Sequence, residues 1–171
     1  MKAMIISDSH GWRSELKEVI DRHRSEVDMV IHCGDSELET EAPELEGVHT
    51  VRGNCDFTGK FPEERVDEAK GIRVFSAHGH LLNVKMSSLQ LKYKGQETEA
   101  DVVCFGHSHV PEAFVEDGML FVNPGSIRLP RGEVNAGTYV ILEIDEKEAK
   151  VTFFTFEGRE VEELSRTLKR S

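Results

Sequence analysis

The stretch Met4-Ile5-Ile6-Ser7-Asp8-Ser9-His10 begins with an apolar run and ends with Asp8 and His10, whose side chains can bind protons and metal ions. Far along the chain, Val102-Val103-Cys104-Phe105-Gly106-His107-Ser108-His109 repeats this order. Both runs have the length of a β-strand and are apolar on both sides of the strand alternation, which indicates strands covered on both faces. Side chains two positions apart on an extended chain point the same way, so each stretch presents a pair of donors at a strand end.

The first two thirds of the chain alternate predicted strands with predicted helices. Strands are predicted at about residues 2–7, 28–33, 48–52, 72–77 and 102–105. Helical spacing of apolar side chains predicts a helix over 14–24 with Ser14 as its N-cap. The residues that set this spacing are Leu16, Val19, Ile20 and His23. A weaker helix is predicted over 87–97, where Gly95 disfavours helical structure. This alternation favours a largely parallel sheet in an α/β protein.

The last third changes character. Asp117-Gly118 is a strong hairpin turn signal between two apolar runs, and residues 138–156 contain a second hairpin pattern. Antiparallel strands after a parallel section predict a second sheet packed on the first. A short closing helix is predicted from the spacing of Val161, Leu164 and Leu168.

Length and composition narrow the class of protein. A chain of 171 residues with 38% hydrophobic and 31% charged residues fits one domain, residues 1–171. No apolar stretch approaches the ~20 residues that span a bilayer, and the N-terminus lacks a signal-peptide core, so we expect a cytoplasmic protein without membrane contact. The net charge of -11 disfavours dedicated nucleic-acid binding and leaves homo-oligomerisation open. Cys33 and Cys104 are predicted to be small buried hydrophobes, and no cysteine spacing indicates a disulfide framework.

Seven nitrogen or oxygen donors are predicted to follow strand ends, namely Asp8, His10, Asp35, Asn54, His78, His107 and His109. A single histidine is usually a surface or hydrogen-bonded core residue, but here five loops in sequence carry donors. Ligands of an open α/β sheet collect where loops leave the carboxyl ends of strands, so these donors can converge. Imidazole, carboxylate and amide donors suit Mn, Fe, Zn, Co or Ni better than Ca. We therefore predict a metal site suited to phosphate-ester chemistry.

The same donors resemble, motif by motif, the calcineurin-like metallophosphoesterase superfamily. Its pattern of Asp-x-His, Gly-Asp, Gly-Asn-x-Asp/Glu, His-Gly and Gly-His-x-His is matched in order by Asp8-Ser9-His10, Gly34-Asp35, Gly53-Asn54-Cys55-Asp56, His78-Gly79 and Gly106-His107-Ser108-His109. The short chain and Asn123-Pro124-Gly125-Ser126 look like the small single-domain branch of bacterial and archaeal phosphodiesterases, whose fold the retromer scaffolding subunit shares. The resemblance spans about residues 1–145. It implies an α/β fold (α+β in some schemes) of two packed mixed β-sheets flanked by helices in four layers.

The resemblance also implies a dinuclear centre with Mn as the expected metal and Ni, Zn, Fe or Co as alternatives. One metal would be held by Asp8, His10, Asp35 and His109, and the other by Asp35, Asn54, His78 and His107. Metals about 3.5–4 Å apart lower the pKa of a bridging water, which then attacks phosphorus as hydroxide. The resemblance thus implies a metal-dependent phosphoesterase.

A charge count bears on the substrate. Two divalent ions, two carboxylates and a bridging hydroxide leave a net charge of roughly +1, which matches a phosphodiester monoanion. We expect a phosphodiesterase of small or nucleotide-like esters, although a phosphomonoesterase stays an alternative because a dianion would also bind. The rival from another class is a non-enzymatic interaction scaffold on the same fold. Such a scaffold would expose a large apolar patch and carry degraded ligand motifs.

Cys55 departs from the pattern of many family members, in which a histidine at this place is thought to protonate the leaving group. A thiol is a poor substitute for an imidazolium acid. Either His80 joins Asp35 and Asn54 as a catalytic residue, or the enzyme favours esters with good leaving groups and His80 is a rim residue. Asp56 either orients a ligand histidine or bonds its own turn backbone. Candidate phosphate clamps, of which we expect at most one to bind phosphate, are Arg13, Lys85, Arg128 and Arg131.

Overall fold

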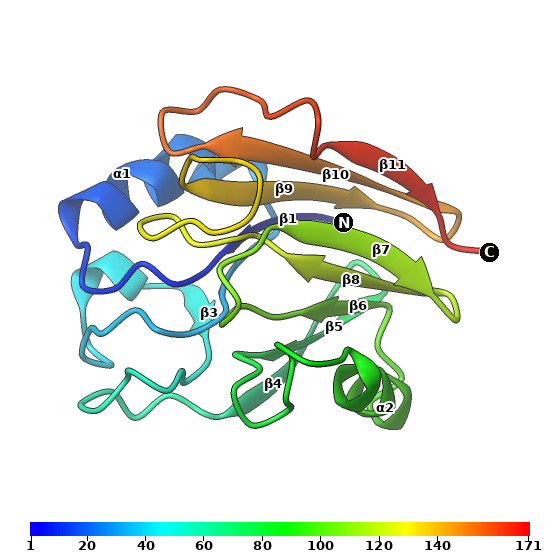
Figure 1. The fold of residues 1–171 in the computed structure, drawn as a ribbon, viewed down its shortest axis with the longest axis horizontal. Helices are drawn as coiled ribbons and strands as arrows, with labels where there is room; N and C mark the ends of the chain where they lie inside the picture. Colours follow the sequence, from blue (N-terminus) through cyan, green and yellow to red (C-terminus); the bar gives the residue numbers. More distant parts are fainter.

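The computed structural model describes residues 1–171 and contains two β-sheets that pack face to face (Figure 1). The larger sheet has the strand order β11 (Arg166–Lys169), β10 (Glu148–Thr155), β9 (Thr138–Ile144), β1 (Lys2–Ile6), β2 (Met29–His32), β3 (Val48–Thr50). The smaller sheet has the order β4 (Glu64–Ala69), β5 (Ile72–Ala77), β6 (Val102–Cys104), β8 (Met119–Asn123), β7 (Glu112–Glu116). The helices are α1 (Ser14–His23) and α2 (Leu89–Glu97), with short 3-10 turns η1 (Arg24–Glu26) and η2 (Pro43–Leu45).

The strand alternation divides the apolar side chains into three cores, as β1 illustrates. Ala3 and Ile5 lie in the cluster between the two sheets, whereas Met4 and Ile6 lie in the cluster under α1. All four are fully buried, which explains the continuous apolar run of this strand. A third cluster, which includes Leu91 of α2, lies on the outer face of the smaller sheet. The order helix, sheet, sheet, helix gives the four layers that the family resemblance implies.

Both sheets are mixed, as the family resemblance implies, but the antiparallel strands of the last third do not form a sheet of their own, so that prediction from the pattern alone is wrong. In the larger sheet β1, β2 and β3 are parallel, while β9 pairs antiparallel with β1 and carries β10. In the smaller sheet β8 pairs parallel with β6, and β7 completes a hairpin. The two hairpins therefore extend existing sheets. The physical reason is that an open strand edge offers unpaired backbone groups to the next strand.

Local predictions had mixed outcomes. Asp117 (φ 50°) and Gly118 (φ 76°) form the predicted hairpin turn, with the positive angles that a type I′ turn needs. Helix α1 is confirmed, but the N-cap is Arg13 and makes no side-chain capping bond, so Ser14 is not the N-cap. Strand β4 was not predicted, because its alternation is charged and largely exposed. Cys33 and Cys104 are buried, as expected.

The predicted closing helix is wrong. The chain turns after Val161, which is buried, and then forms β11, where Leu168 pairs with Ala149 of β10. Strand β10 pairs with β9 on one side, and without β11 the backbone groups on the outer edge of residues 148–151 would be unpaired, which outweighs the weak helical spacing. Neither α-helix of the structure has the length and apolar character that crossing a bilayer requires.

The parallel strands of both sheets point to the same end of the sandwich, at the left of Figure 1, while the C-terminus lies at the opposite end. Loops that leave these carboxyl ends carry every donor predicted from the sequence. We call this the site end of the molecule.

Candidate metal centre

The loops of the site end bring five of the seven predicted donors, together with Cys55, into three overlapping groups. In each group the donor atoms lie within 4.8 Å of one another, and the groups are Asp8, His10 and His109; His10, Asp35 and Cys55; Asp8, Asp35 and His78. The two carboxylates and one histidine recur between groups. This sharing indicates a compact polar centre rather than separate surface sites.

The backbone that carries the donors is strained. Positive φ angles occur at Asp8 (54°), His10 (43°), Asp35 (57°), His107 (70°) and His109 (63°). Each such residue costs of order 1 kcal/mol, so the surroundings must hold it in place. Asp8 N–H donates to the Gly34 carbonyl at 3.0 Å and His10 N–H to the Asp35 carbonyl at 2.9 Å. Loops from two neighbouring strands thus fix each other.

Asp8 is fully buried and divides its two oxygens between different tasks. Oδ2 accepts bonds from Ser7 Oγ at 2.7 Å and from the backbone N–H of His107 at 3.2 Å. Oδ1 has no hydrogen-bond partner. Burial opposes its ionisation, but His109 and His78 outweigh burial and keep the pKa of Asp8 below its usual value. The carboxylate therefore stays charged with one oxygen free for a cation.

Two imidazoles converge on that free oxygen. His109 Nε2 lies 3.2 Å and His10 Nε2 3.8 Å from Asp8 Oδ1, and the two nitrogens are 3.3 Å apart. His109 Nδ1–H donates to the Leu129 carbonyl at 2.8 Å, and His10 Nδ1–H donates to Glu37 Oε2 at 2.9 Å. These bonds occupy both Nδ1 atoms, so the two Nε2 atoms face each other and a carboxylate oxygen. This is the arrangement of ligands around a shared cation.

His78 and Asp35 form the adjoining part of the centre. His78 Nδ1–H donates to the Cys33 carbonyl at 2.7 Å, and its Nε2 lies 3.2 Å from Asp35 Oδ2 and 3.8 Å from Asp8 Oδ1. Burial disfavours charge here, yet Asp35 and Asp8 outweigh it and raise the pKa of His78. Likewise burial is outweighed by His78 and by the Cys55 N–H, so the pKa of Asp35 is well below its usual value. The two carboxylates thus favour a positively charged group at this point.

A divalent metal fits these residues on three observations. Asp8 Oδ1 is a buried charged atom without a partner, and such groups are costly unless paired. Three imidazoles direct Nε2 towards this atom while their Nδ1 atoms are held by oxygen acceptors, as in metal-binding histidines. Finally, a Cβ on Gly53 would come within 2.0 Å of Asp35 Oδ1, so the glycine leaves the space that the Asp35 carboxylate occupies.

The remaining predicted residues lie beside this centre. Asn54 Oδ1 is 3.1 Å from His78 Nε2, and the ring centroid of His107 is 5.1 Å from that of His78. Burial, followed by the positive charges of His78 and Lys85, lowers the pKa of His107 to about 4, which leaves the neutral imidazole that binds metals. The ring of His80 lies 5.4 Å from His78, and its buried Nδ1 has no hydrogen-bond partner. All seven predicted ligands are therefore gathered at one place.

Asp56 does not orient a histidine. Its oxygens accept the backbone N–H groups of Asp35 at 2.9 Å, Glu37 at 2.8 Å and Gly53 at 2.6 Å. Asp56 therefore bonds its own turn, as one of the two interpretations expected, and also fixes the loop that carries Asp35. Burial and the charge of Asp35 raise the pKa of the neighbouring Cys55 thiol to about 11.

Sequence reasoning missed two supporting residues. His32 is fully buried, accepts the Gly34 N–H through Nδ1 at 3.1 Å and donates to Ser9 Oγ at 2.8 Å. Burial lowers its pKa to about 4, so it joins the first two donor loops as a neutral residue. Ser126 donates to the Asp8 carbonyl at 2.8 Å from a loop far away in sequence. A polar histidine inside an apolar strand was the one available signal, whereas the partner of Ser126 depends on tertiary folding.

The chain belongs to the calcineurin-like phosphoesterase superfamily, whose domain model matches residues 1–147. It is 47% identical over 164 residues to the protein named "Probable metallophosphoesterase YsnB" of Bacillus subtilis (strain 168), with 96% of each chain covered. Members of this family are metal-dependent phosphoester hydrolases, which agrees with the donor groups described above.

The solved structures that resemble the fold include two of particular interest. A predicted phosphoesterase from Streptococcus pneumoniae TIGR4 has a TM-score of 0.95 at 40% identity and covers 98% of this chain and 97% of its own. Vps29 from Entamoeba histolytica, solved with Zn²⁺, has a TM-score of 0.76 at 21% identity with both chains fully covered. At that identity the likeness to Vps29 concerns the fold alone.

Proposed function

We propose that the protein is a dinuclear metal-dependent phosphodiesterase that hydrolyses small or nucleotide-like phosphodiesters. The observation that carries this proposal is the sharing of Asp8 and Asp35 between overlapping donor groups. A carboxylate has two oxygens, so Asp35 can serve two adjacent cations, with Asp8, His10 and His109 on one side. On the other side the ligands would be Asn54, His78 and His107. Mn is the first choice of metal, with Ni, Zn, Fe and Co as alternatives.

Two bound divalent ions would lower the pKa of a water molecule and withdraw charge from the phosphoryl group. The residues of the chain supply position and electrostatics. Asp8 and Asp35 offset much of the metal charge, which leaves a net charge of roughly +1 after deprotonation of the water and so favours a monoanionic diester. Asn54 is exposed at the entrance, where its amide can contact both a metal and the ester.

The assignment is tested by Asp35→Ala and His107→Ala in the Mn²⁺-loaded protein with bis(p-nitrophenyl) phosphate as substrate. Both variants should lose nearly all activity while retaining their circular dichroism spectra. Full activity in both would rule out the assignment. Parallel assays with p-nitrophenyl phosphate, and with each candidate metal, distinguish a diesterase from a monoesterase and identify the preferred ion.

The proton donor to the leaving group has two candidates. The Cys55 thiol is a weak acid, and burial followed by the charge of His78 lowers the pKa of His80, which disfavours its imidazolium form. If neither donates, rates should fall steeply as the leaving group becomes poorer, and Cys55→His should reduce this dependence. If His80 donates, His80→Asn should slow esters of poor leaving groups much more than p-nitrophenyl esters.

A scaffold function is the second candidate, because large apolar side chains are exposed in the segment that follows His80. Large apolar side chains at least 49% exposed occur in the segment 81–93, at Leu81, Met86, Leu89 and Tyr93. Metal content of the purified protein separates the two functions. About two equivalents of transition metal per chain would support the enzyme, and a metal-free protein that does not bind added Mn²⁺ would support the scaffold.

A further inference from the structure

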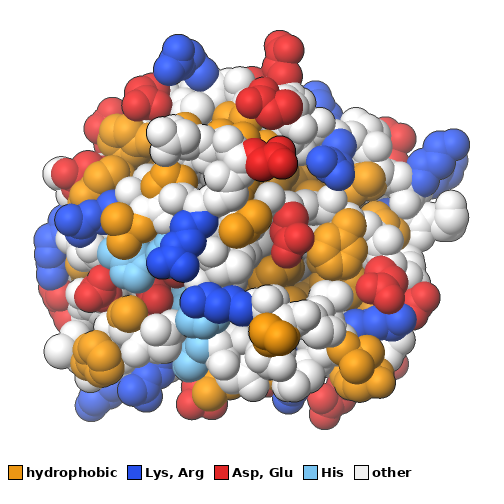
Figure 2. Space-filling model, viewed as in Figure 1, with side chains coloured by type: hydrophobic (Ala, Val, Ile, Leu, Met, Phe, Trp, Pro, Cys, Tyr) orange, Lys and Arg blue, Asp and Glu red, His pale blue; other side chains and the backbone are white.

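Lysine and arginine side chains without carboxylate partners gather around the metal centre. The chain has a net charge of -11, and most arginines on its surface form ion pairs, as Arg13 does with Glu39 and Glu44. Cations on the site loops that form no ion pair within 4.0 Å include Arg52, Lys85, Arg128 and Arg131. Figure 2 shows Lys and Arg side chains directly beside the surface histidines. A positive rim on such an acidic protein indicates an anionic ligand at this place.

Arg128 is the member of this rim that the structure holds in place. Its backbone N–H donates to Ser126 Oγ at 3.3 Å, and Ser126 is itself bonded to the Asp8 carbonyl. One terminal nitrogen of its guanidinium, Nη1, donates to the His10 carbonyl. The guanidinium carbon lies 5.6 Å from the ring centroid of Trp12, which packs in turn on Phe156.

The rest of this guanidinium is free. Nε and Nη2 make no hydrogen bond with the protein, and the residue is exposed. A guanidinium whose orientation is already fixed loses little entropy when it binds, and its planar fork matches two phosphate oxygens. Arg128 is thus prepared for an anion without being occupied by a carboxylate of the chain.

The position of Arg128 determines which anionic group of a substrate it can bind. It contacts the backbone carbonyl of His10, whereas the donor atoms of the centre belong to side chains that converge on Asp8 Oδ1. A phosphoryl group engaged by the donor centre would therefore leave Arg128 for another anionic group of the same molecule. Leu129, which is 50% exposed, and Trp12 add apolar surface beside Arg128.

We propose that Arg128 binds a second phosphate group of the substrate, so that the preferred substrates are phosphoesters that carry a further phosphate. This inference rests on the proposed phosphoesterase function. It assigns Arg128 a role in substrate specificity, while Arg52, Lys85 and Arg131 raise the local positive potential without a fixed contact.

Calorimetric binding to the full-length, Mn²⁺-loaded protein tests this proposal with three nucleotides that differ only in phosphate groups. The probes are adenosine 3′-monophosphate, adenosine 5′-monophosphate and adenosine 3′,5′-bisphosphate. The unaltered protein should bind the bisphosphate at least about tenfold more tightly than either monophosphate, the effect of one charge-assisted hydrogen bond. Arg128→Ala should bring this ratio close to one, and Arg128→Lys should retain part of it.

Lys150→Ala is the matched control, because it removes one unpaired positive charge at the opposite end of the sandwich. This variant should keep the full preference for the bisphosphate. Equal binding of all three nucleotides by the unaltered protein would overturn the proposal. So would an equal weakening of all three by Arg128→Ala, which is the result expected from general electrostatic attraction. Binding does not require turnover, so an inactive protein would count against the proposed function and not against this subsite.

Discussion

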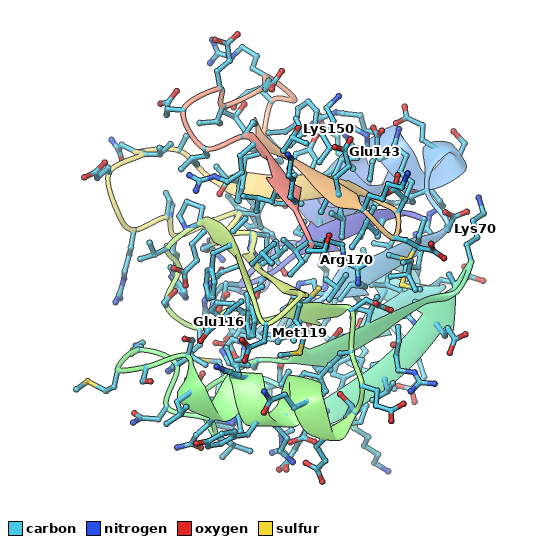
Figure 3. All side chains as sticks on the ribbon, turned by 90° about the vertical axis from the view of Figure 1, so that its right-hand side faces the viewer. Lys70, Glu116, Met119, Glu143, Lys150 and Arg170 are labelled. Carbon is cyan, nitrogen blue, oxygen red and sulfur yellow. The ribbon has the colours of Figure 1, made fainter.

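The two ends of the sandwich use charged residues in opposite ways. At the site end, Asp8 is fully buried, has an oxygen without a partner and sits on a strained backbone. At the opposite end, which faces the viewer in Figure 3, Lys70 pairs with Asp28 at 2.8 Å and Glu143 with Lys2 at 3.7 Å on open surface. The first arrangement is costly without a cation, whereas the second is already satisfied. Burial together with missing partners, and not charge density, therefore distinguishes the site end.

The largest expected contrast is between Asp8→Asn and Glu143→Gln, each of which neutralises one carboxylate. Asp8→Asn should lower kcat/KM for the chromogenic diester by about 1000-fold or more, because it weakens metal binding and the positioning of the remaining ligands. Glu143→Gln should leave kcat/KM and metal content unchanged. Measurement of both quantities checks this, and similar effects from the two variants would contradict the contrast between the ends.

Metal removal should change the stability of the protein through the site end alone. At metal concentrations about 100 times Kd, binding stabilises the folded state by about 2.7 kcal/mol, so chelation should lower Tm measurably. The Asp8→Asn variant should show a much smaller shift on chelation, whereas Lys150→Ala should shift as the unaltered protein does. Differential scanning calorimetry with and without chelator measures this. Identical shifts for all three proteins would place the bound metal elsewhere.

Glycines at the two ends should tolerate alanine differently. A Cβ on Gly53 would approach Asp35 Oδ1 to 2.0 Å, so Gly53→Ala should lose most activity and about 1–3 kcal/mol of stability. Gly71 has φ 75° but nothing within 4 Å of its Cβ position, so Gly71→Ala should cost about 1 kcal/mol of backbone strain and keep full activity. Urea denaturation and the diester assay test both variants. A fully active Gly53→Ala would show that this close approach does not matter for the site.

The smallest effect is expected from the surface ion pair of the opposite end. Lys70→Ala removes the partner of Asp28, whose pKa is held below its usual value first by Lys70 and then by the Lys2 N–H. The pair is exposed, so the free energy of unfolding should fall by no more than about 1 kcal/mol. High salt should make this difference smaller still. Urea denaturation at two salt concentrations measures this. A decrease of several kcal/mol in the free energy of unfolding would mean that charged residues at the opposite end contribute as much to stability as those at the site end.

Prediction from the sequence succeeded where a local pattern had only one physical solution. The run before Asp8 is apolar on both sides of the strand, so it had to be a buried strand, and the donors after it had to lie at a strand end. The pattern of residues 161–168 is compatible with either a helix or an added strand. The structure contains the strand, because it pairs with the open edge of β10. The assignment of hairpins to sheets failed for the same reason, because strand pairing is a long-range choice.

Five short motifs in order specify residue types and the strand ends that carry them, so the chain alone was enough to predict the family, the four-layer class of fold and the candidate donor residues. Which atoms of those residues are free depends on how the loops pack. Only the packed loops show that Asp8 Oδ1 has no partner, that Asp56 fixes the Asp35 loop, and that Arg128 is held beside His10. These facts depend on distances between segments far apart in the chain, which no local pattern contains.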